Sequence, residues 1–510
     1  MRTRMREMRK MREMREMREM LRSSGFLSGW HRGTFALAFC SAMTVPAMAE
    51  ITNYGEAMTA ALRYNPAVTS AYFDFEAARH AEAVAEGQLY PSVDLNADYG
   101  REERETPLIN NSRYDRDSVR FQISQLVFDG FQTRDIVASR HYEQLASYYA
   151  YQQSTQQVAL EATNAYLDTV VYQKLVDAAE QNYVVHRQVF NRLLTRNEGG
   201  LSNGVDVEQA TARLALAESN LLTEVTNLHD IQLEFQRVIG QVPSLALPMP
   251  KLPEDALPGL RDEVLRQAYR NNPAVNRAIE DMRAAREASS ATRGDFFPRI
   301  DLRYRNEFET DSGGVRGDFD LQAVELVMTY NFYSGGSDVA RRREANARYY
   351  AAVEARKQAC LNTRRDTMIA FNDIAALDRQ VRFLEDQLAS QERARAGYSD
   401  QFELGQRSLL DLLDSQNEYF DTQRALVQAR ARLVSSFAAA LAETGSLTKA
   451  LNAEGFNEAR IMALDLDLER SSDEAIPKCP EGAPGEIQIN EEAIFERLNT
   501  RAETLPSSLP

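Results

Sequence analysis

The stretch ALRYNPAV at residues 61–68 returns as AYRNNPAV at residues 268–275, 207 positions further along the chain. An ungapped comparison of residues 61–99 with residues 268–306 gives 16 identities in 39 positions. Similarity of a sequence to itself at a fixed offset is typical of an internal repeat. The sequence therefore predicts one structural unit that occurs twice, and fold and function have to be read from that doubled unit.

Each copy begins with a helical pattern and then changes its period. The first helix is predicted over about residues 55–88, and its second copy over about residues 262–294. After Pro91 and again after Pro298, apolar and polar residues alternate. Such alternation predicts a strand with one apolar and one polar face.

A polar segment follows in each copy, at residues 101–117 and 307–320, and we expect it to form a hairpin. A second alternating strand comes next, at about residues 119–127 and 324–332. The chain thus offers four strands of about ten residues, the length that a tilted strand needs to cross the hydrocarbon of a bilayer. Beyond the N-terminal segment no window holds about 18 uncharged apolar residues, so a membrane-spanning helix is not expected.

Glycine marks the exit of each strand pair, at Gly130 in the first copy and at Gly335 and Gly336 in the second. The helical patterns that follow cover residues 131–197 and 337–402, about 100 Å each at about 1.5 Å per residue. Helices of that length do not belong to a compact globule. Tyrosines gather at matching places in both, at residues 148–151 and 349–350, where we expect packing or an interfacial aromatic girdle.

Glycine turns then reverse the chain into a shorter helix in each copy. We expect these turns at Gly200 and Gly405, followed by helices over about residues 205–240 and 408–443. The first and last helices of a copy, about 34 and about 36 residues, together match the length of the long one. Two short helices stacked end to end would therefore run beside one long helix.

The pattern divides the chain into two repeats and three other segments. Residues 50–242 form the first repeat, residues 243–261 a stiff proline-rich linker, and residues 262–445 the second repeat. Residues 446–510 are acidic and contain proline, and we expect them to be disordered or laid on the surface.

Residues 1–49 have the features of a signal peptide. Arg32 precedes an apolar run at residues 35–45, and the Ala-Met-Ala of residues 47–49 supplies a cleavage site before Glu50. Upstream lies a repetitive Met-Arg-Glu tract, and Met20 would begin a signal peptide of ordinary length. We therefore expect the chain to be exported.

Charge and side-chain chemistry exclude several functions. Without residues 1–49 the chain has 49 Lys and Arg against 71 Asp and Glu, a net charge of −22, so nucleic acid is not expected as a partner. The histidines are scattered, and no phosphate loop or nucleophile motif occurs. We predict no enzymatic activity, no cofactor and no metal site. Cys360 and Cys479 do not indicate a structural disulfide framework.

Four strands in one chain leave two open edges. In lipid, each unpaired backbone group at such an edge costs several kcal/mol, so closure has to come from further copies of the chain. Two chains give eight strands, whose interior is filled by side chains, and three give twelve strands with a wider lumen. Oligomerisation is thus required if the strands lie in a membrane.

The ordered set of these features resembles the TolC family of outer-membrane efflux and secretion channels. The set comprises the duplicated layout, the Asn-Pro near each first helix, the proline-headed strands, the Phe-Asp-Gly strand exit and the Gly-x5-Asp turns, over about residues 54–443. The resemblance implies an α+β membrane protein that assembles as a homotrimer. In it, a twelve-stranded β-barrel in the outer membrane of a Gram-negative bacterium continues into a periplasmic α-helical barrel. Outer-membrane lipid, a periplasmic adaptor protein and an inner-membrane pump of the ABC or RND type are the implied partners.

The resemblance also assigns roles to residues at the periplasmic tip. Asp411 and Asp414 match the family's acidic constriction ring, and Arg407 matches the arginine of its gating links. Asp206 matches an acidic link partner in the first copy. Phe402 falls where well-studied members have a link-forming tyrosine, so the hydroxyl bond of that link is missing here.

The spacing of the two aspartates supports this role without the resemblance. Asp411 and Asp414 are three residues apart and share a helical face. Three chains around an axis would then crowd six carboxylates into a neck, which attracts cations and resists full ionisation.

Simpler interpretations remain open. Asp411 and Asp414 also suit residues that cap or solvate the start of a helix. A coiled-coil structural protein of the cell envelope, without a pore, would explain the long helices but not four strands with lipid-compatible faces. The function implied by the resemblance is a passive exit duct, gated at its helical end, for type I protein secretion or for small-molecule efflux. The sequence does not distinguish these two cargoes.

Overall fold

The computed structural model describes residues 50–106, 109–199 and 204–453, together with Ile461, Leu464 and Cys479. The predicted signal peptide, Gly200 and most of the predicted tail lie outside the described residues. None of the helices in this described part combines sufficient length with sufficient apolar character to cross a bilayer.

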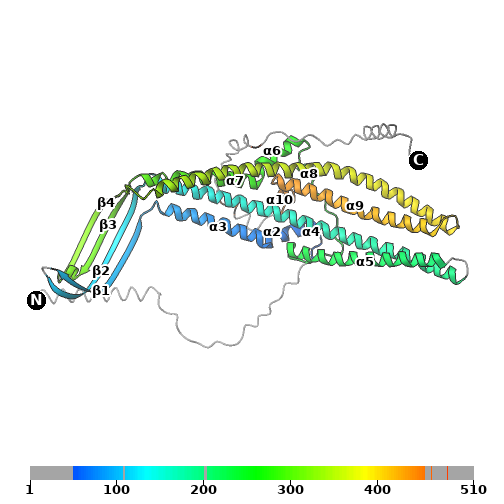
Figure 1. Cartoon of the computed structure of the whole chain (residues 1–510), viewed down its shortest axis with the longest axis horizontal. Helices are drawn as coiled ribbons and strands as arrows, with labels where there is room; N and C mark the ends of the chain where they lie inside the picture. Colours follow the sequence, from blue (N-terminus) through cyan, green and yellow to red (C-terminus); the bar gives the residue numbers. More distant parts are fainter. Residues whose placement is uncertain are drawn as a thin grey trace, which may run out of the picture. The chain divides into compact units, whose positions relative to one another are not determined.

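The two repeats follow the same order of elements (Figure 1). Two short helices are followed by two strands, a helix of 67 residues and a shorter helix. In the first copy these are α2 (Tyr54–Tyr64), α3 (Pro66–Gly87), β1 (Ser92–Thr106), β2 (Ile109–Phe128), α4 (Gln132–Glu198) and α5 (Gly204–Ile239). In the second they are α6 (Arg261–Asn271), α7 (Pro273–Ala291), β3 (Arg299–Thr310), β4 (Asp318–Thr329), α8 (Ser337–Glu403) and α9 (Leu409–Glu443), and α10 (Leu447–Ala450) follows.

The repeated Asn-Pro breaks a helix, so the prediction of one continuous first helix in each copy was wrong. A proline disfavours helical geometry in the residue before it, and Asn65 and Asn272 are extended, with ψ near 126° and 121°. The proline itself is well placed as the first residue of the next helix. The side-chain oxygen of each asparagine accepts a hydrogen bond from the second helical residue, at 2.9 Å in both copies.

The same two asparagines also join the ends of helices that are far apart in sequence. Asn65 Nδ2 donates to the carbonyl of Val238 near the end of α5, at 3.2 Å. Asn272 Nδ2 donates to the carbonyl of Glu443 at the end of α9, at 3.0 Å. Each repeat therefore uses its asparagine to satisfy a carbonyl at the end of its own last helix. The short helices consequently lie end to end beside the long one, as predicted (Figure 1).

The main core surrounds α4, where α2, α3, α5, α9 and α10 pack against it. Its largest fully buried side chains include Tyr72, Tyr166 and Phe235. Leu447 and Ala453 belong to the same cluster, as does Ile461. The expectation of disorder or surface placement from Ser446 onward was thus wrong for these residues, because α10 adds one more apolar helical turn to the core.

A disulfide joins Cys360 on α8 to Cys479, so the expectation that these cysteines have no structural bond was wrong. The Cα atoms are 5.4 Å apart across a sequence separation of 119 residues. Cys479 packs with Cys360 among Leu265, Tyr269 and other residues of α6, α7 and α8. No local spacing in the sequence could indicate a bond over such a separation.

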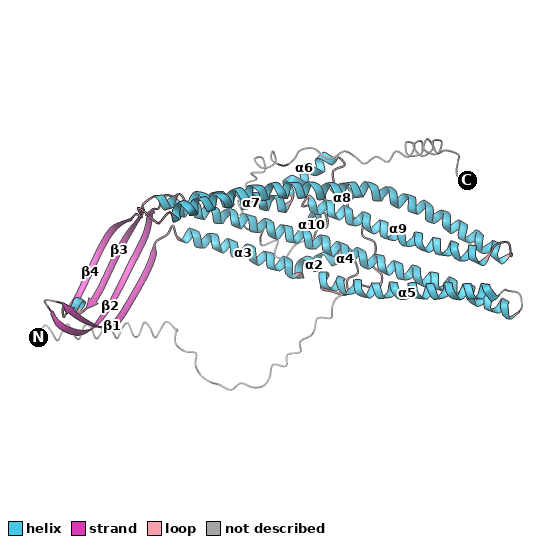
Figure 2. Ribbon diagram, in the orientation of Figure 1, coloured by secondary structure: helices cyan, strands magenta, loops and turns pink. Residues whose placement is uncertain are grey.

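The strands form one antiparallel sheet in the order β1-β2-β3-β4 (Figure 2). They are 15, 20, 12 and 12 residues long, so the predicted length of about ten was too short, above all in the first copy. The polar segment predicted as a hairpin there belongs mostly to β1 and β2. Arg101 pairs with Asp115 at 2.8 Å and Arg113 with Glu103 at 3.0 Å across these strands. Cross-strand ion pairs therefore extend the ladder where apolar alternation ends.

Candidate functional site: strand faces and helical tip

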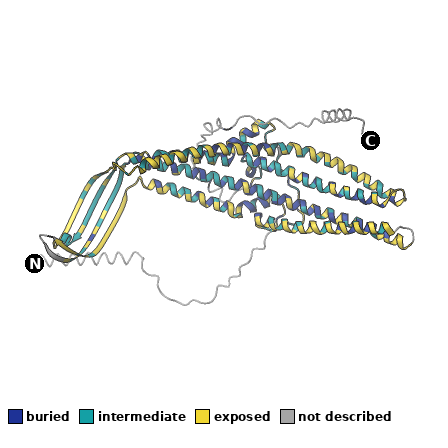
Figure 3. Ribbon diagram, in the orientation of Figure 1, coloured by how far each residue is buried: buried dark blue, intermediate teal, exposed yellow. Residues whose placement is uncertain are grey.

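One face of the sheet is apolar and exposed. The register places Leu95 opposite Phe121 and Tyr304 opposite Val324, so apolar side chains of all four strands lie on the same side. Leu95 is 70% exposed and Val324 73% exposed, and no helix covers this face among the described residues (Figure 3). A large exposed apolar surface on a sheet requires a partner, and lipid is one that also suits the alternation.

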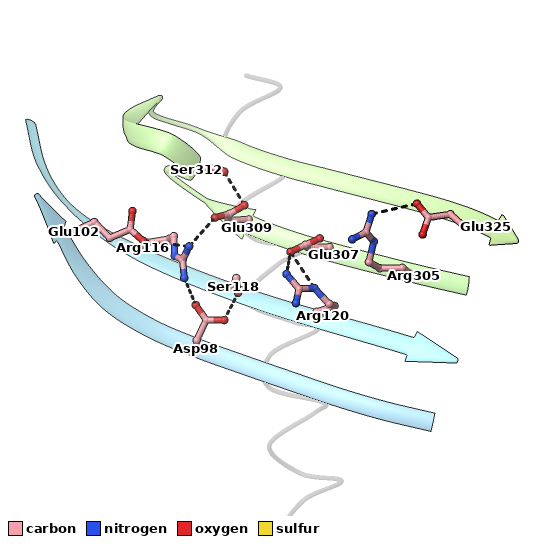
Figure 4. A network of polar contacts seen from close by, with 10 residues as sticks. All are labelled: Asp98, Glu102, Arg116, Ser118, Arg120, Arg305, Glu307, Glu309, Ser312 and Glu325. Atoms are coloured by element: carbon pink, nitrogen blue, oxygen red, sulfur yellow. Dashed lines mark hydrogen bonds and ion pairs between the residues drawn. The ribbon is translucent and has the colours of Figure 1, made fainter. Parts of the chain in front are cut away.

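The opposite face carries a network of ion pairs across the strands (Figure 4). Arg116 on β2 lies 2.7 Å from Asp98 and 3.2 Å from Glu102, both on β1. It also lies 3.6 Å from Glu309 on β3. Ser118 Oγ donates to Asp98 Oδ1 at 2.5 Å.

The network continues to the other edge of the sheet. Arg120 on β2 pairs with Glu307 on β3, which is its direct neighbour in register. Arg305 on β3 pairs with Glu325 on β4 at 3.4 Å (Figure 4). The alternation predicted this polar face but not its pairs, because opposite charges can be matched only once the register is known. A charged face is unsuited to lipid and suits water, as in the lumen of a barrel.

Both edges of the sheet are open. Neither the outer edge of β1 nor that of β4 has a strand partner among the described residues. Unpaired edges are avoided in soluble proteins and are costly in lipid, so further strands would be needed to close this sheet in a membrane.

Glycines shape the exits from the sheet, as the sequence predicted. Gly130 has φ of +68°, and an added Cβ would lie 2.8 Å from the side chain of Phe297. Gly335 and Gly336 also have positive φ, at +69° and +84°. Beside Gly130, Asp129 accepts hydrogen bonds from the backbone and hydroxyl of Thr133, at 2.9 and 2.5 Å, and so starts α4 directly after β2.

The helical tip is the end of the molecule where α4 meets α5 and α8 meets α9. Gly405, with φ of +72°, makes the turn between α8 and α9. Apolar residues from both helix pairs form one cluster beside this turn, which includes Val189, Leu193, Leu412 and Phe402. Phe402 is buried there, and Arg196 lies over its ring at 5.9 Å. Its place in the tip is thus a packing position.

Asp411 and Arg407 make local contacts within one chain. Asp411 forms a capping box with Ser408, whose hydroxyl accepts from the Asp411 backbone N–H at 3.2 Å. Arg407 donates to Gln401 at 3.1 Å, lies over the ring of Tyr398 and is 3.8 Å from Asp411. The capping interpretation of Asp411 therefore holds within the chain.

The second aspartate and the predicted link partner differ in their surroundings. Asp414 pairs with Arg213 on α5 at 2.7 Å, which joins the two repeats. Asp206 lies in the first turn of α5 and forms no ion pair with Arg407 among the described residues. The structure thus brings Asp414 to the first copy but does not join Arg407 to Asp206.

Three ion pairs that the sequence did not predict connect the two repeats, two of them near the tip and one about midway along α5 and α9. They are Arg213–Asp414, Arg192–Glu403 at 2.8 Å, and Glu224–Arg424 at 2.7 Å. Glu224 is only 4% exposed, and Arg424 lies over the ring of Phe420. A buried carboxylate of this kind needs its partner, because removal of the arginine would leave an uncompensated charge. Their only sequence signal is charge of opposite sign on helices of different copies, which is too common to be specific.

Comparison with known proteins agrees with this architecture. The family model described as "Outer membrane efflux protein" matches residues 57–241 and 264–445, the two repeats. The outer membrane efflux protein BepC of Brucella suis is 25% identical over 332 residues, which cover 65% of this chain and 72% of BepC. The proteases secretion protein PrtF of Dickeya chrysanthemi is 22% identical over 74% of this chain and 84% of its own.

A solved structure shows the same fold. The CmeC outer membrane channel of Campylobacter jejuni superimposes with a TM-score of 0.71, at 14% identity, over 88% of this chain and 98% of CmeC. The resemblance to the TolC family is therefore confirmed, and with it the outer membrane as the location. With both repeats matched by the family model, this chain belongs to the outer membrane efflux protein family.

Proposed function

We propose that this chain is the exit duct of a tripartite export system, a passive channel whose energy comes from a partner pump. The observation that carries the proposal is the sheet: an exposed apolar face, a charged opposite face and two open edges, continuous with two helices of 67 residues. The apolar face would contact lipid and the charged face would line the water-filled duct.

Three copies would complete the duct. Closing β4 of one protomer on β1 of the next removes both open edges, and twelve strands leave a lumen that eight would not. The helices would then form the periplasmic continuation of the barrel. The proposed partners are a periplasmic adaptor and an inner-membrane pump of the ABC or RND type. We propose that the adaptor binds at a cavity of about 530 Å³ between α4, α8 and α9. Arg395 lies over the ring of Tyr419 there, at 4.2 Å.

The cargo is either a protein or a small molecule. PrtF is named for protease secretion and BepC for efflux, and this chain is similar to both at nearly the same level. Both cargoes therefore remain within the proposal.

The helical tip would act as the gate. Arg213–Asp414 and Arg192–Glu403 tie the two helix pairs of a protomer together, and Arg407 and Asp206 would add links once three tips meet. Asp411 and Asp414 of three chains would form the constriction. Exposed ion pairs contribute only about 0–1 kcal/mol each, so several of them make a closure that a docking partner can release.

Two measurements test the proposal. The mass of the protein extracted in detergent from the outer-membrane fraction should correspond to three chains, whereas a soluble or dimeric chain would favour a coiled-coil protein without a pore. In planar bilayers, Arg213→Ala, Arg407→Ala and Asp206→Ala should each raise the conductance several-fold. Arg187→Ala is the matched control, because Arg187 lies 3.9 Å from Glu218 of its own copy and should leave the gate closed. Unchanged conductance in all three variants would contradict the gate.

A further inference from the structure

A basic pocket lies between α7 and α8, close to the point where these helices meet the sheet. Arg286, Arg293 and Arg342 line it together with Ser289 and Asn346, around a cavity of about 270 Å³. Ser289 Oγ donates to Asn346 Oδ1 at 2.7 Å, which ties the two walls together. None of the described residues that line this basic pocket is a carboxylate.

The positive charge of the basic pocket is poorly compensated. Arg342 has no ion pair with any described residue, whereas its neighbour Arg341 pairs with Asp295 and Asp338. Arg293 Nε donates to the neutral carbonyl of Ser290 at 3.3 Å. Arg286 lies 3.8 Å from Glu287, which is beyond hydrogen-bond distance. Three guanidinium groups around one cavity, in a chain of net charge −16, attract an anion. The planar fork of arginine matches the oxygens of a phosphate group.

Exposed aromatic residues at the strand ends indicate where the basic pocket would lie relative to the membrane surface. Tyr90, Phe297, Phe332 and Tyr333 lie between the sheet and the helices and are 53% to 89% exposed. Such residues at strand ends form the aromatic girdle at the membrane–water interface of a barrel. Arg342 lies five residues into α8, about 8 Å along the helix, which is close to the roughly 5–8 Å thickness of one headgroup layer.

The duplicated sequence provides an internal comparison. In the ungapped comparison of the two copies, Ser289 and Arg293 correspond to Glu82 and Glu86. Glu82 is paired with His141 at 2.9 Å in the first copy. At these two positions the first copy carries acidic residues, whereas Arg286 corresponds to Arg79, which pairs with Glu76 at 2.7 Å. The cluster of three arginines is therefore not a general property of the repeat.

We propose that the basic pocket binds the phosphate of an anionic phospholipid in the periplasmic leaflet of the outer membrane. The inference rests on the proposed function, because it requires the sheet to lie in that membrane. Arg293 and Arg342 would hold the phosphate oxygens from the two walls, and the acyl chains would lie along the apolar face of β3 and β4. Basic pockets beside membrane-spanning segments recognise anionic headgroups in this way.

The test uses the full chain purified in detergent and native mass spectrometry with cardiolipin, phosphatidylglycerol or phosphatidylcholine. The variant R293Q/R342Q should bind the two anionic lipids roughly 30-fold more weakly, from the loss of two arginines near the surface. R293K/R342K keeps the charge and should retain most of the binding. R379Q/R393Q removes two exposed arginines from α8 farther along the helix and should bind as the wild type does. Inorganic phosphate at millimolar concentration should not displace the lipid.

Other outcomes would overturn the inference in distinguishable ways. Equal binding of cardiolipin by R293Q/R342Q and the wild type would show that the basic pocket is not a lipid site. Displacement by inorganic phosphate would assign it to a free anion. Loss of the trimer in R293Q/R342Q, with circular dichroism unchanged, would assign the arginines to acidic side chains of a second copy. A wild-type chain that never forms a trimer would contradict the proposed function itself.

Discussion

The helices α4 and α8 have the same length and the same place in the repeat, yet they are buried to very different extents. Of their 67 residues each, 25 are buried in α4 and only seven in α8 (Figure 3). α4 is packed between α3, α5, α7 and α9, whereas α8 contacts α6, α7 and α9 and leaves one side open. Duplication thus produced one helix that the chain buries itself and one with an open side, which a neighbouring chain would bury in the proposed trimer.

The open side of α8 is apolar at regular intervals. Val339, Tyr350 and Leu361 are spaced by eleven residues, and Phe383 falls on the same spacing two intervals later. All four are exposed. Eleven residues make about three helical turns, so these side chains form one stripe along the helix. In the proposed trimer this stripe would suit the contact between protomers beyond Tyr350, which also lines the basic pocket.

The largest expected effect is on the free energy of unfolding, and it compares α4 and α8 at the same position along each helix. Tyr166 and Phe371 are each the thirty-fifth residue of their helix, but Tyr166 is fully buried and Phe371 is half-buried. Tyr166→Ala should lower the free energy of unfolding by about 3–5 kcal/mol, and Phe371→Ala by less than half as much. Denaturant titration of both variants in detergent measures the difference, and equal losses would contradict the assignment of α4 as the core helix.

A smaller effect is expected on the pH dependence of the free energy of unfolding. It should arise only in the second copy, at the contact of Asn272 with the end of α9, which we call the joint of that copy. Burial, with a further contribution from nearby Asp366, raises the pKa of Glu443 from 4.5 to about 7. The folded chain therefore binds a proton more tightly than the unfolded one. This stabilisation is fully present below about pH 4.5 and is lost as the pH rises through about 7. We expect the free energy of unfolding to fall by about 2–3 kcal/mol over this range.

The first copy supplies the control for this pH dependence. Val238 takes the place of Glu443 at the corresponding joint, where Asn65 binds its carbonyl. Glu443→Gln should therefore flatten the pH profile of unfolding between pH 4.5 and 8. A profile that keeps its full slope in this variant would assign the dependence to another group.

The smallest effect compares the two repeated asparagines. Asn65→Ala removes a helix cap and should cost about 1 kcal/mol. Asn272→Ala removes the same cap and also a bond at 2.9 Å to the Glu443 carboxyl, so we expect a cost of about 2 kcal/mol. Thermal unfolding of the two variants measures the difference. A larger loss in Asn65→Ala would show that the joint of the first copy is the more important one.

The sequence predicted the elements whose signals are local. Hydrophobic period, proline and glycine predicted the four strands, both 67-residue helices and the turn at Gly405. The repeated Asn-Pro indicates the duplication, but the helical pattern around it did not predict that the helix ends there. The strand ends were misplaced because ion pairs between strands, such as Arg113–Glu103, have no signature along one strand.

The helical tip could be predicted only in part. Position in the repeat predicted that Asp411, Asp414, Arg407 and Phe402 lie there. Their partners depend on which helices of different copies meet, and residues as distant as Arg213 and Asp414 carry no mutual signal in one sequence. The role of the constriction and of the Arg407 and Asp206 links therefore stays a prediction for the assembled trimer.

The disulfide between Cys360 and Cys479 can form only at one stage of the protein's export. Thiols remain reduced in the cytoplasm and are oxidised in the periplasm. The described helices contact one another without this bond, but Cys479 is joined to α8 only after the chain has crossed the inner membrane. Completion of the fold is thereby tied to arrival in the right compartment, so a chain retained in the cytoplasm would lack this bond.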